Sequence, residues 1–145
     1  MAENKIVITI QTTVKAPIDT VWKCWITPAD IIKWNSASDD WHTTKAVNDF
    51  HVGRKFSYRM EAKDGSVGFD FGGVYDSITD HKQVSYTMED GRAVTITFSV
   101  IGNEETEVIE SFDAETFNPI EMQQDGWQAI LNSFRKYTEH QFSEQ

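Results

Sequence analysis

Hydrophobic and polar residues alternate along most of this chain, which is the pattern of β-strands that bury one face. Residues 5–14 alternate in this way and predict a first strand. The alternation returns over 54–112 in five strands, with turn signals at Asp64-Gly65, Asp90-Gly91 and Gly102-Asn103. Glycine in such pairs accepts the positive φ of a tight hairpin turn. The pattern therefore predicts a strand and, after an interval, an antiparallel meander of five strands.

The interval between these strands predicts two short helices and a loop. Pro17 begins a helix that runs towards Trp25, because the missing N–H of proline costs nothing at the first helical position. Residues 27–30 predict a second helix, with Thr27 as the cap and Asp30 reaching back as in a capping box, and this helix ends near residue 34. Residues 35–49 are polar and predict a loop, with a short strand at 45–50.

One place in the meander breaks the alternation. Phe69 and Phe71 share a parity, whereas Val74 and Ile78 take the opposite one. The pair Gly72-Gly73 lies between them, and a β-bulge or sharp bend there explains the switch.

A long helix is predicted at the end of the chain, with Asn118 as its cap, Pro119 at its first position and Glu121 at its third. Its apolar residues recur at spacings of three and four, so one stripe is aromatic and aliphatic. Gly126 interrupts the helix at a cost of about 1 kcal/mol relative to alanine. Either close packing against another element or room for a ligand beside Trp127 explains this glycine. The stripe comprises Ile120, Trp127, Ile130, Leu131, Phe134 and Tyr137.

Short motifs across nearly the whole chain, together with this order of elements, match a known superfamily. The matching residues are Val14-Lys15-Ala16-Pro17, Val21-Trp22, Pro28 and Trp34, Val52-Gly53-Arg54-Lys55-Phe56, Met60-Glu61-Ala62-Lys63-Asp64-Gly65, Gly73-Val74-Tyr75, Phe112-Asp113 and Gly126-Trp127-Gln128-Ala129-Ile130-Leu131-Asn132-Ser133-Phe134. With them the chain resembles the helix-grip fold of the START-like (SRPBCC) superfamily, in which a curved sheet wraps around the last helix. Within it, the sequence is most similar to the family named for the C-terminal domain of the activator of heat-shock-protein-90 ATPase. The resemblance implies an α+β helix-grip domain over 1–145, with six or seven antiparallel strands. It implies the fold more strongly than any activity, because such scaffolds hold many unrelated sites.

Length and charge narrow the classes of function. The chain has 145 residues and a formal net charge of −10. The length fits one domain, and the charge argues against nucleic acid as a partner. No apolar run approaches the length of a membrane span and no secretory signal is recognised, so the expectation is a soluble cytoplasmic protein without membrane insertion. The acidic residues between Arg92 and Arg135 are expected to form a solvated face.

The aromatic residues of the meander and the helix stripe predict a ligand cavity, because ligand sites are concave and mostly apolar with a few directing polar groups. Tyr58 and Tyr86 would supply such groups. The alternative is that these side chains simply pack as core. The predicted ligand-binding residues are Trp34, Trp41, Phe56, Tyr58, Met60, Phe69, Phe71, Tyr86, Met88, Ile96, Phe98, Val108, Glu110, Trp127, Ile130 and Phe134.

Glu110 is the most informative polar residue, because it shares its parity with Val108 and should point inward. A buried carboxylate is costly, has a raised pKa and often marks a site. The alternative is a register shift that leaves Glu110 in solvent and Ile109 inside. Arg54 or Arg59 could pair with a buried Glu110.

Two histidines lie near the predicted mouth of the cavity, but neither indicates a catalytic role. His42 and His51 have no reacting partner at useful spacing and fit the surface or loops. Cys24 has no second cysteine and is expected to be a small buried hydrophobe. No zinc spacing, phosphate-binding loop or nucleophile elbow occurs, so neither metal nor cofactor is expected.

Three functions remain open. The first is a cytoplasmic carrier or sensor of a small hydrophobic or aromatic molecule. The second is a cyclase-like or aromatase-like enzyme, with Glu110 as acid or base and a tyrosine orienting a substrate carbonyl. The third is a protein-interaction domain of the co-chaperone kind, for which a chaperone would be the partner.

Overall fold

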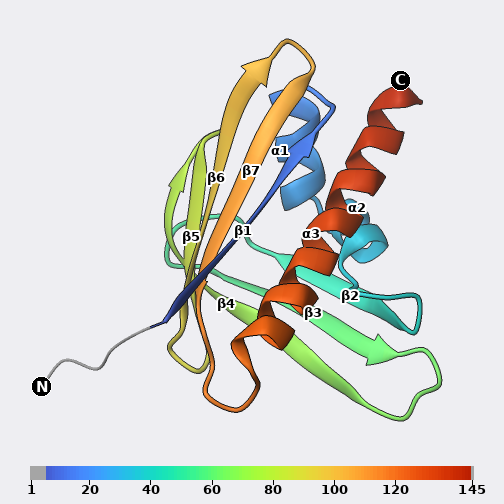
Figure 1. Ribbon diagram of the computed structural model, residues 1–145, viewed down its shortest axis with the longest axis vertical. Helices are drawn as coiled ribbons and strands as arrows, with labels where there is room; N and C mark the ends of the chain where they lie inside the picture. The colour runs from blue at the N-terminus through green and yellow to red at the C-terminus, as the bar shows by residue number, and fades with distance from the viewer. Residues whose placement is uncertain (1–5, 145) are drawn as a thin grey trace, which may run out of the picture.

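The computed structural model of this chain describes residues 6–144 and has one curved sheet with three helices (Figure 1). The sheet is antiparallel, with the strand order β1-β7-β6-β5-β4-β3-β2, so six strands form a meander and the first strand returns beside the last. This is the α+β helix-grip fold. The elements are β1 (Val7–Val14), α1 (Ile18–Ile26), α2 (Pro28–Trp34), β2 (Trp41–Asn48), β3 (Lys55–Ala62), β4 (Gly68–Thr79), β5 (Gln83–Met88), β6 (Ala93–Gly102), β7 (Glu105–Asp113) and α3 (Ile120–Ser143).

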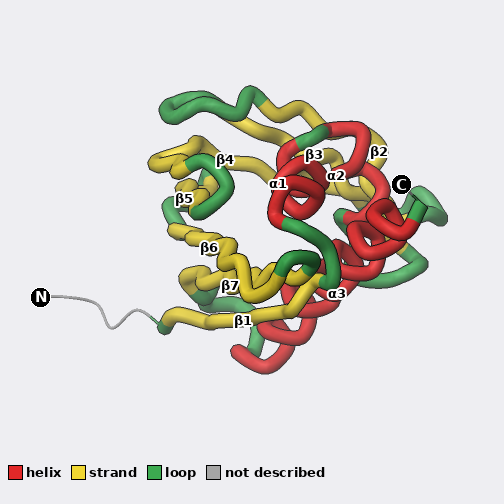
Figure 2. Tube along the Cα trace, turned by 90° about the horizontal axis from the view of Figure 1, so that it is seen from above, coloured by secondary structure: helices red, strands yellow, loops and turns green. Residues whose placement is uncertain are grey.

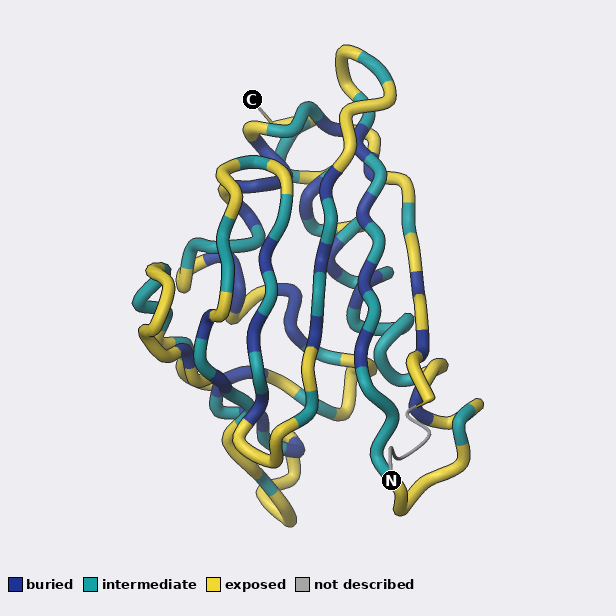
Figure 3. The backbone as a smooth tube through the Cα atoms, turned by 90° about the vertical axis from the view of Figure 1, so that its left-hand side faces the viewer, coloured by how far each residue is buried: buried dark blue, intermediate teal, exposed yellow. Residues whose placement is uncertain are grey.

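The sheet curves into a trough, and the three helices lie along its open side (Figure 2). The long helix α3 packs against β1 at one border of the sheet, and α2 packs against β2 at the other. Burial alternates along the strands, with buried residues between half-buried or exposed ones (Figure 3). The alternation read from the sequence therefore gives the correct inner face for most of the sheet. Lys5, the predicted first residue of the first strand, lies outside the described residues.

The strand β2 is longer than the sequence predicts, because it begins at Trp41 inside the expected loop. Its pairing with β3 shifts register between Thr43 and Lys45. Such a bulge breaks the period of two on which strand prediction depends. The strand is also at the edge of the sheet, where polar residues are common.

The interruption predicted at Gly72-Gly73 is wrong in position. The pairing of β3 with β4 runs without a shift from Gly68 to Val74, and the register shift of β4 against β5 lies between Tyr75 and Ser77. Both glycines serve close approach of the strands instead. A Cβ at Gly73 would lie 2.5 Å from the carbonyl oxygen of Thr87, and one at Gly72 would overlap the carbonyl oxygen of Phe56.

The predicted helix caps are correct for α2 and wrong for α3. Thr27 is the N-cap of α2, as predicted, and Pro119 instead of Asn118 is the N-cap of α3; neither makes a side-chain capping bond. Asn118 lies one residue too early to cap α3, and its side chain donates to Glu115 instead. Asp30 joins separate helices rather than capping its own.

The carboxylate of Asp30 connects all three helices. It is buried, and it accepts hydrogen bonds from the Tyr137 hydroxyl of α3 at 2.5 Å and from the Lys23 ammonium of α1 at 3.1 Å. Nearby, the Trp34 indole donates to the backbone oxygen of Cys24 at 2.9 Å, which ties α2 to α1. Cys24 is buried as predicted. These bonds fix the helices to one another and α3 to the pair.

We expect Tyr137→Phe to lower the free energy of unfolding by about 1.5 kcal/mol, because a hydrogen bond to a buried carboxylate is lost. Urea denaturation followed by circular dichroism measures this change. Tyr86→Phe is the matched control, since its hydroxyl makes no hydrogen bond within residues 6–144, and its cost should stay below about 0.5 kcal/mol. Equal costs for the two substitutions would contradict the role of the Asp30 contact.

Candidate functional site

A cavity of about 340 Å³ lies between the inner face of the sheet and α3. It reaches the surface beside Met122 and Phe69, which are 60% and 46% exposed. Its walls are mostly aromatic and aliphatic. The lining residues are Trp25, Trp34, Asn35, Phe56, Tyr58, Met60, Phe69, Phe71, Tyr75, Val84, Tyr86, Arg92, Glu110, Glu115, Asn118, Met122, Gln123, Gly126, Trp127, Ile130 and Leu131.

Most of the residues singled out in the sequence come together around this cavity. Those that line it are Trp34, Phe56, Tyr58, Met60, Phe69, Phe71, Tyr86, Glu110, Trp127 and Ile130. The predicted residues that do not line it are Trp41, Met88, Ile96, Phe98, Val108 and Phe134.

The predicted residues outside the cavity lie elsewhere in the packing. Phe134 packs edge-on against Trp25 and Trp34, each at 4.9 Å between ring centroids, and Phe98 packs edge-on against Trp25 at 5.6 Å. Met88, Ile96 and Val108 are buried core residues. Trp41 is half-buried against Phe69, at 5.9 Å between centroids. Parity gives the face of a strand correctly, but it does not tell which part of that face stays uncovered.

Other lining residues were not predicted. Val84 and Leu131 have the periodicity of inward-facing residues, but the sequence did not mark them as ligand-binding. Tyr75 escaped prediction because the alternation switches after it, between Tyr75 and Ser77, and not before it at Gly72-Gly73. Trp25 lines the cavity from α1. Three polar rim residues had no periodic signal, because they belong to a turn or to the loop before α3: Arg92, Glu115 and Asn118. Gln123 lies in the first turn of α3, outside its apolar stripe.

Glu110 points inward, so the first of the two predicted orientations is correct. Its residue is 6% exposed, and its neighbours on the adjacent strands are Ile10 of β1 and Ile96 of β6. Its carboxyl makes no hydrogen bond or ion pair within the described part of the chain. Burial therefore raises the pKa of Glu110 from its ordinary value near 4.5 to about 8. The acidic stretch of the sequence is consequently not one solvated face.

Arg54 and Arg59, the predicted candidates for pairing with Glu110, lie elsewhere. Arg54 bonds Asp49 at 2.7 Å, and Arg59 bonds Glu61 at 2.9 Å. The carboxyl of Glu110 consequently faces the cavity without a basic partner from either.

Three tyrosines add hydroxyl groups to the cavity wall. Burial raises the pKa of Tyr58 and of Tyr86, and the carboxyl of Glu110 raises the pKa of Tyr86 further. The hydroxyl of Tyr75 donates to Asn48, whose amide nitrogen donates to the backbone oxygen of Ile26 at 2.7 Å. Tyr86, in contrast, makes no hydrogen bond within residues 6–144. Glu110 and Tyr86 thus form a polar pair without partners in an apolar wall.

Gly126 leaves room in the cavity rather than allowing close packing. A Cβ added at this position would meet nothing within 4 Å, and the glycine lines the cavity next to Trp127. The indole of Trp127 stacks on Phe112 of β7, at 3.9 Å between centroids and 11° between planes. The indole is therefore held flat at the wall while the space beside Gly126 stays open.

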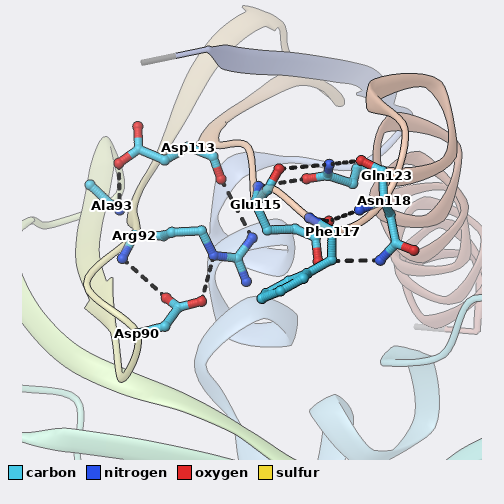
Figure 4. A network of polar contacts seen from close by, with 8 residues as sticks. All are labelled: Asp90, Arg92, Ala93, Asp113, Glu115, Phe117, Asn118 and Gln123. Carbon is cyan, nitrogen blue, oxygen red and sulfur yellow. Dashed lines mark hydrogen bonds and ion pairs between the residues drawn. The ribbon is translucent and has the colours of Figure 1, made fainter. Parts of the chain in front are cut away.

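A network of polar contacts holds the rim on the side of the loop before α3 (Figure 4). The carboxylate of Glu115 accepts from the backbone amides of Phe117 and Asn118, and the buried amide of Gln123 donates to the backbone oxygen of Asn118 at 2.8 Å. Across from them, the guanidinium of Arg92 bonds Asp90 at 2.7 Å. These bonds hold the rim in place.

The histidines singled out in the sequence lie on the surface, in line with the surface interpretation. His42 is exposed on β2, and His51 is exposed and bonded to Asp49 at 2.9 Å. Across residues 6–144, no three histidine, cysteine or acidic side chains gather in a way that could hold a metal ion. The helices within this range are also too short or too polar to span a membrane.

Comparison with known proteins decides the family. The family model described as "Activator of Hsp90 ATPase homolog 1-like protein" matches residues 15–139. The chain belongs to this family. The predicted membership is therefore confirmed, and with it the START-like superfamily. No protein with a curated description matches the chain.

Solved structures of similar proteins share the architecture. An AHSA1-like protein from Aeromonas hydrophila is 42% identical, with a TM-score of 0.87 and 94% of each chain covered. A protein from Cytophaga hutchinsonii is 51% identical, with a TM-score of 0.79 and 95% of each chain covered. A third, from Chromobacterium violaceum, is 20% identical with a TM-score of 0.82, covers 92% of this chain and 98% of its own, and supports the fold alone.

We expect Gly126→Ala to raise the free energy of unfolding by about 1 kcal/mol, because alanine favours the helix and its methyl group enters open space. Urea denaturation of the purified variant measures this gain. Gly73→Ala is the matched control and should destabilise the protein, since its Cβ would press on the carbonyl of Thr87. A loss of stability in the Gly126 variant would show that the space beside Trp127 is filled.

The buried carboxyl of Glu110 makes the free energy of unfolding depend on pH. Its pKa is higher in the folded state than in the unfolded chain, so its favourable contribution to the free energy of unfolding is complete below about pH 4.5 and is lost as pH rises towards 8. The loss amounts to about 1.4 kcal/mol per pH unit within this window. Glu110→Gln should therefore match the wild type near pH 5 and exceed it in stability at pH 8.5.

Urea denaturation at both pH values, with Glu121→Gln as an exposed control on α3, makes this comparison. The control should keep the pH dependence of the wild type. If Glu110→Gln also kept it, the carboxyl would have to be ionised or solvated in the folded state.

Proposed function

We propose that this protein is a cytoplasmic carrier or sensor that binds a small hydrophobic or aromatic molecule in the cavity between the sheet and α3. The observation that carries the proposal is the unpaired polar couple of Glu110 and Tyr86 in a wall of aromatic side chains. Ligand sites combine such an apolar wall with a few polar groups that fix orientation. The cavity volume of about 340 Å³ also lies within the range of small-molecule sites.

The unused polar groups favour a ligand over plain packing. Buried polar groups are normally hydrogen-bonded, because an unmet donor or acceptor costs about 1–3 kcal/mol. If Glu110 and Tyr86 served only to pack the core, apolar residues at these two positions would do so without this cost. A ligand that bonds Glu110 or Tyr86 recovers the loss, and its apolar body gains ~25 cal/mol per Å² buried.

The aromatic rings of the wall are suited to hold a flat or bulky apolar body. Phe56 packs edge-on against Tyr86 at 4.7 Å between centroids, and Phe71 packs edge-on against Trp127 at 6.0 Å. Their positions are fixed by mutual contacts, so little side-chain freedom is lost on binding. This arrangement supports a preformed site.

An enzyme of the cyclase or aromatase kind is the second candidate. The specific observation in its favour is the buried carboxyl of Glu110, whose pKa of about 8 suits a general acid or base near neutral pH. Tyr86 beside it would orient a substrate carbonyl. Both candidates use the same cavity, but only the enzyme requires Glu110 to exchange a proton with its ligand.

Binding of N-phenyl-1-naphthylamine, a fluorophore without charge at neutral pH, tests the shared cavity. We expect fluorescence enhancement with the wild type and at least a tenfold weaker affinity with Gly126→Leu, whose side chain fills the open space beside Trp127. Gln124→Leu places the same side chain on the exposed face of α3 and should bind like the wild type. Equal affinities for the two variants would rule out this cavity as the binding site.

A further inference from the structure

The polar groups inside the cavity suit an incoming hydrogen-bond donor. The carboxyl of Glu110 has two oxygens, and neither is used by the described residues. Tyr58 and Tyr86 line the same cavity, and a hydroxyl oxygen can accept a hydrogen bond. The proton of Tyr75 is committed to Asn48. An incoming group that donates hydrogen bonds therefore finds acceptors on Glu110 and on the tyrosines.

The aromatic faces around these oxygens also favour positive charge. Trp127, Phe56, Phe71 and Tyr86 line the same cavity as Glu110, and the faces of such rings attract an ammonium group electrostatically. This attraction is worth about 2 kcal/mol when the cation is removed from water. An anionic head group would instead meet the negative faces of the same rings.

The basic residue of the cavity wall is bonded at a turn, although its positive charge also acts on Tyr86, where it offsets a part of the rise that burial causes in the pKa of that phenol. Arg92 lies at the rim, where its guanidinium bonds Asp90 at 2.7 Å and reaches the backbone oxygen of Asp113 at 3.5 Å. Glu115 also lines the cavity at this rim, and its carboxylate adds a negative charge to that of Asp90. The whole chain carries a net charge of −10, which raises the concentration of cations near its surface.

We infer that the ligand is a hydrophobic amine, whose protonated head group donates to Glu110 deep in the cavity while its apolar body lies against the aromatic wall. This inference rests on the proposed function and names the ligand class. In the complex the ammonium keeps its protons, and the carboxyl of Glu110 releases one proton to solvent and pairs as the carboxylate. The complex therefore holds one positive and one negative charge inside the cavity, and the two neutralise each other.

The release of this proton makes affinity depend on pH. The titratable groups that face Glu110 are Tyr86 on β5, Tyr58 on β3 and Tyr75 on β4, all with raised pKa, together with Arg92 and Glu115 at the rim. The part of α3 that lines the interior contributes uncharged side chains, Trp127 and Ile130 among them. Glu110 is thus the group that changes charge between pH 6 and 8, and amine affinity should rise about tenfold per pH unit in this range.

Isothermal titration calorimetry with three ligands of one skeleton tests the inference: 4-phenylbutylamine, 4-phenylbutan-1-ol and 4-phenylbutyrate. We expect the amine to bind at least tenfold more tightly than the alcohol at pH 8, and the acid to bind most weakly. Titrations in two buffers of different ionisation enthalpy should show one proton released per amine at pH 6.5. The amine, with a pKa near that of lysine at ~10.4, stays protonated throughout.

Glu110→Gln supplies the decisive variant. It should bind amine and alcohol with affinities within about threefold of each other and release no proton, while Glu121→Gln keeps the preference of the wild type. An amine that binds no better than the alcohol, or a preference that survives Glu110→Gln, would overturn the inference. If the wild type binds none of the three compounds but binds N-phenyl-1-naphthylamine, the amine class is wrong and the cavity stands as a binding site. If the fluorophore fails as well, the proposed function itself is wrong.

Discussion

The constraint on which the structure depends is that the second half of α3 is anchored in packed core while its first half borders a cavity. Leu131, Phe134 and Thr138 are fully buried, and Phe134 packs edge-on against the stacked rings of Trp25 and Trp34. Asp30 fixes the same half through the hydroxyl of Tyr137. In the preceding turns, Gly126, Trp127 and Ile130 are only half-buried because they border open space. Under this first half, Trp127 touches the sheet through Phe112, and the space beside that contact stays open.

This division explains which parts of the site could be read from the sequence. Alternation along β3, β5 and β7 gave the inner face, and with it Tyr58, Tyr86 and the inward direction of Glu110. It could not separate Val108, which is fully buried core, from residues of the same face that border the cavity. That difference depends on how far α3 stands from each strand, and no local pattern encodes such a distance.

Long-range contacts account for the other differences. Asp30 has the spacing of a capping residue, yet it bonds a tyrosine more than a hundred positions away in the sequence. Gly72 and Gly73 look like a break in a strand, yet they allow neighbouring backbones to come close. In both cases the partner is distant in the sequence, so a rule based on neighbouring residues does not detect it. Tyr75 was missed for a related reason, because the bulge follows it and the alternation had been reset too early.

The separate anchoring of the two halves of α3 has a consequence for how the cavity can differ among relatives. Met122 lines the cavity in the first turn of the helix and lies outside the segment 126–134 that carries the family resemblance. A substitution there changes the mouth of the cavity while Phe134 and the bond between Tyr137 and Asp30 still secure the helix. Recognition can therefore diverge among relatives while the scaffold persists.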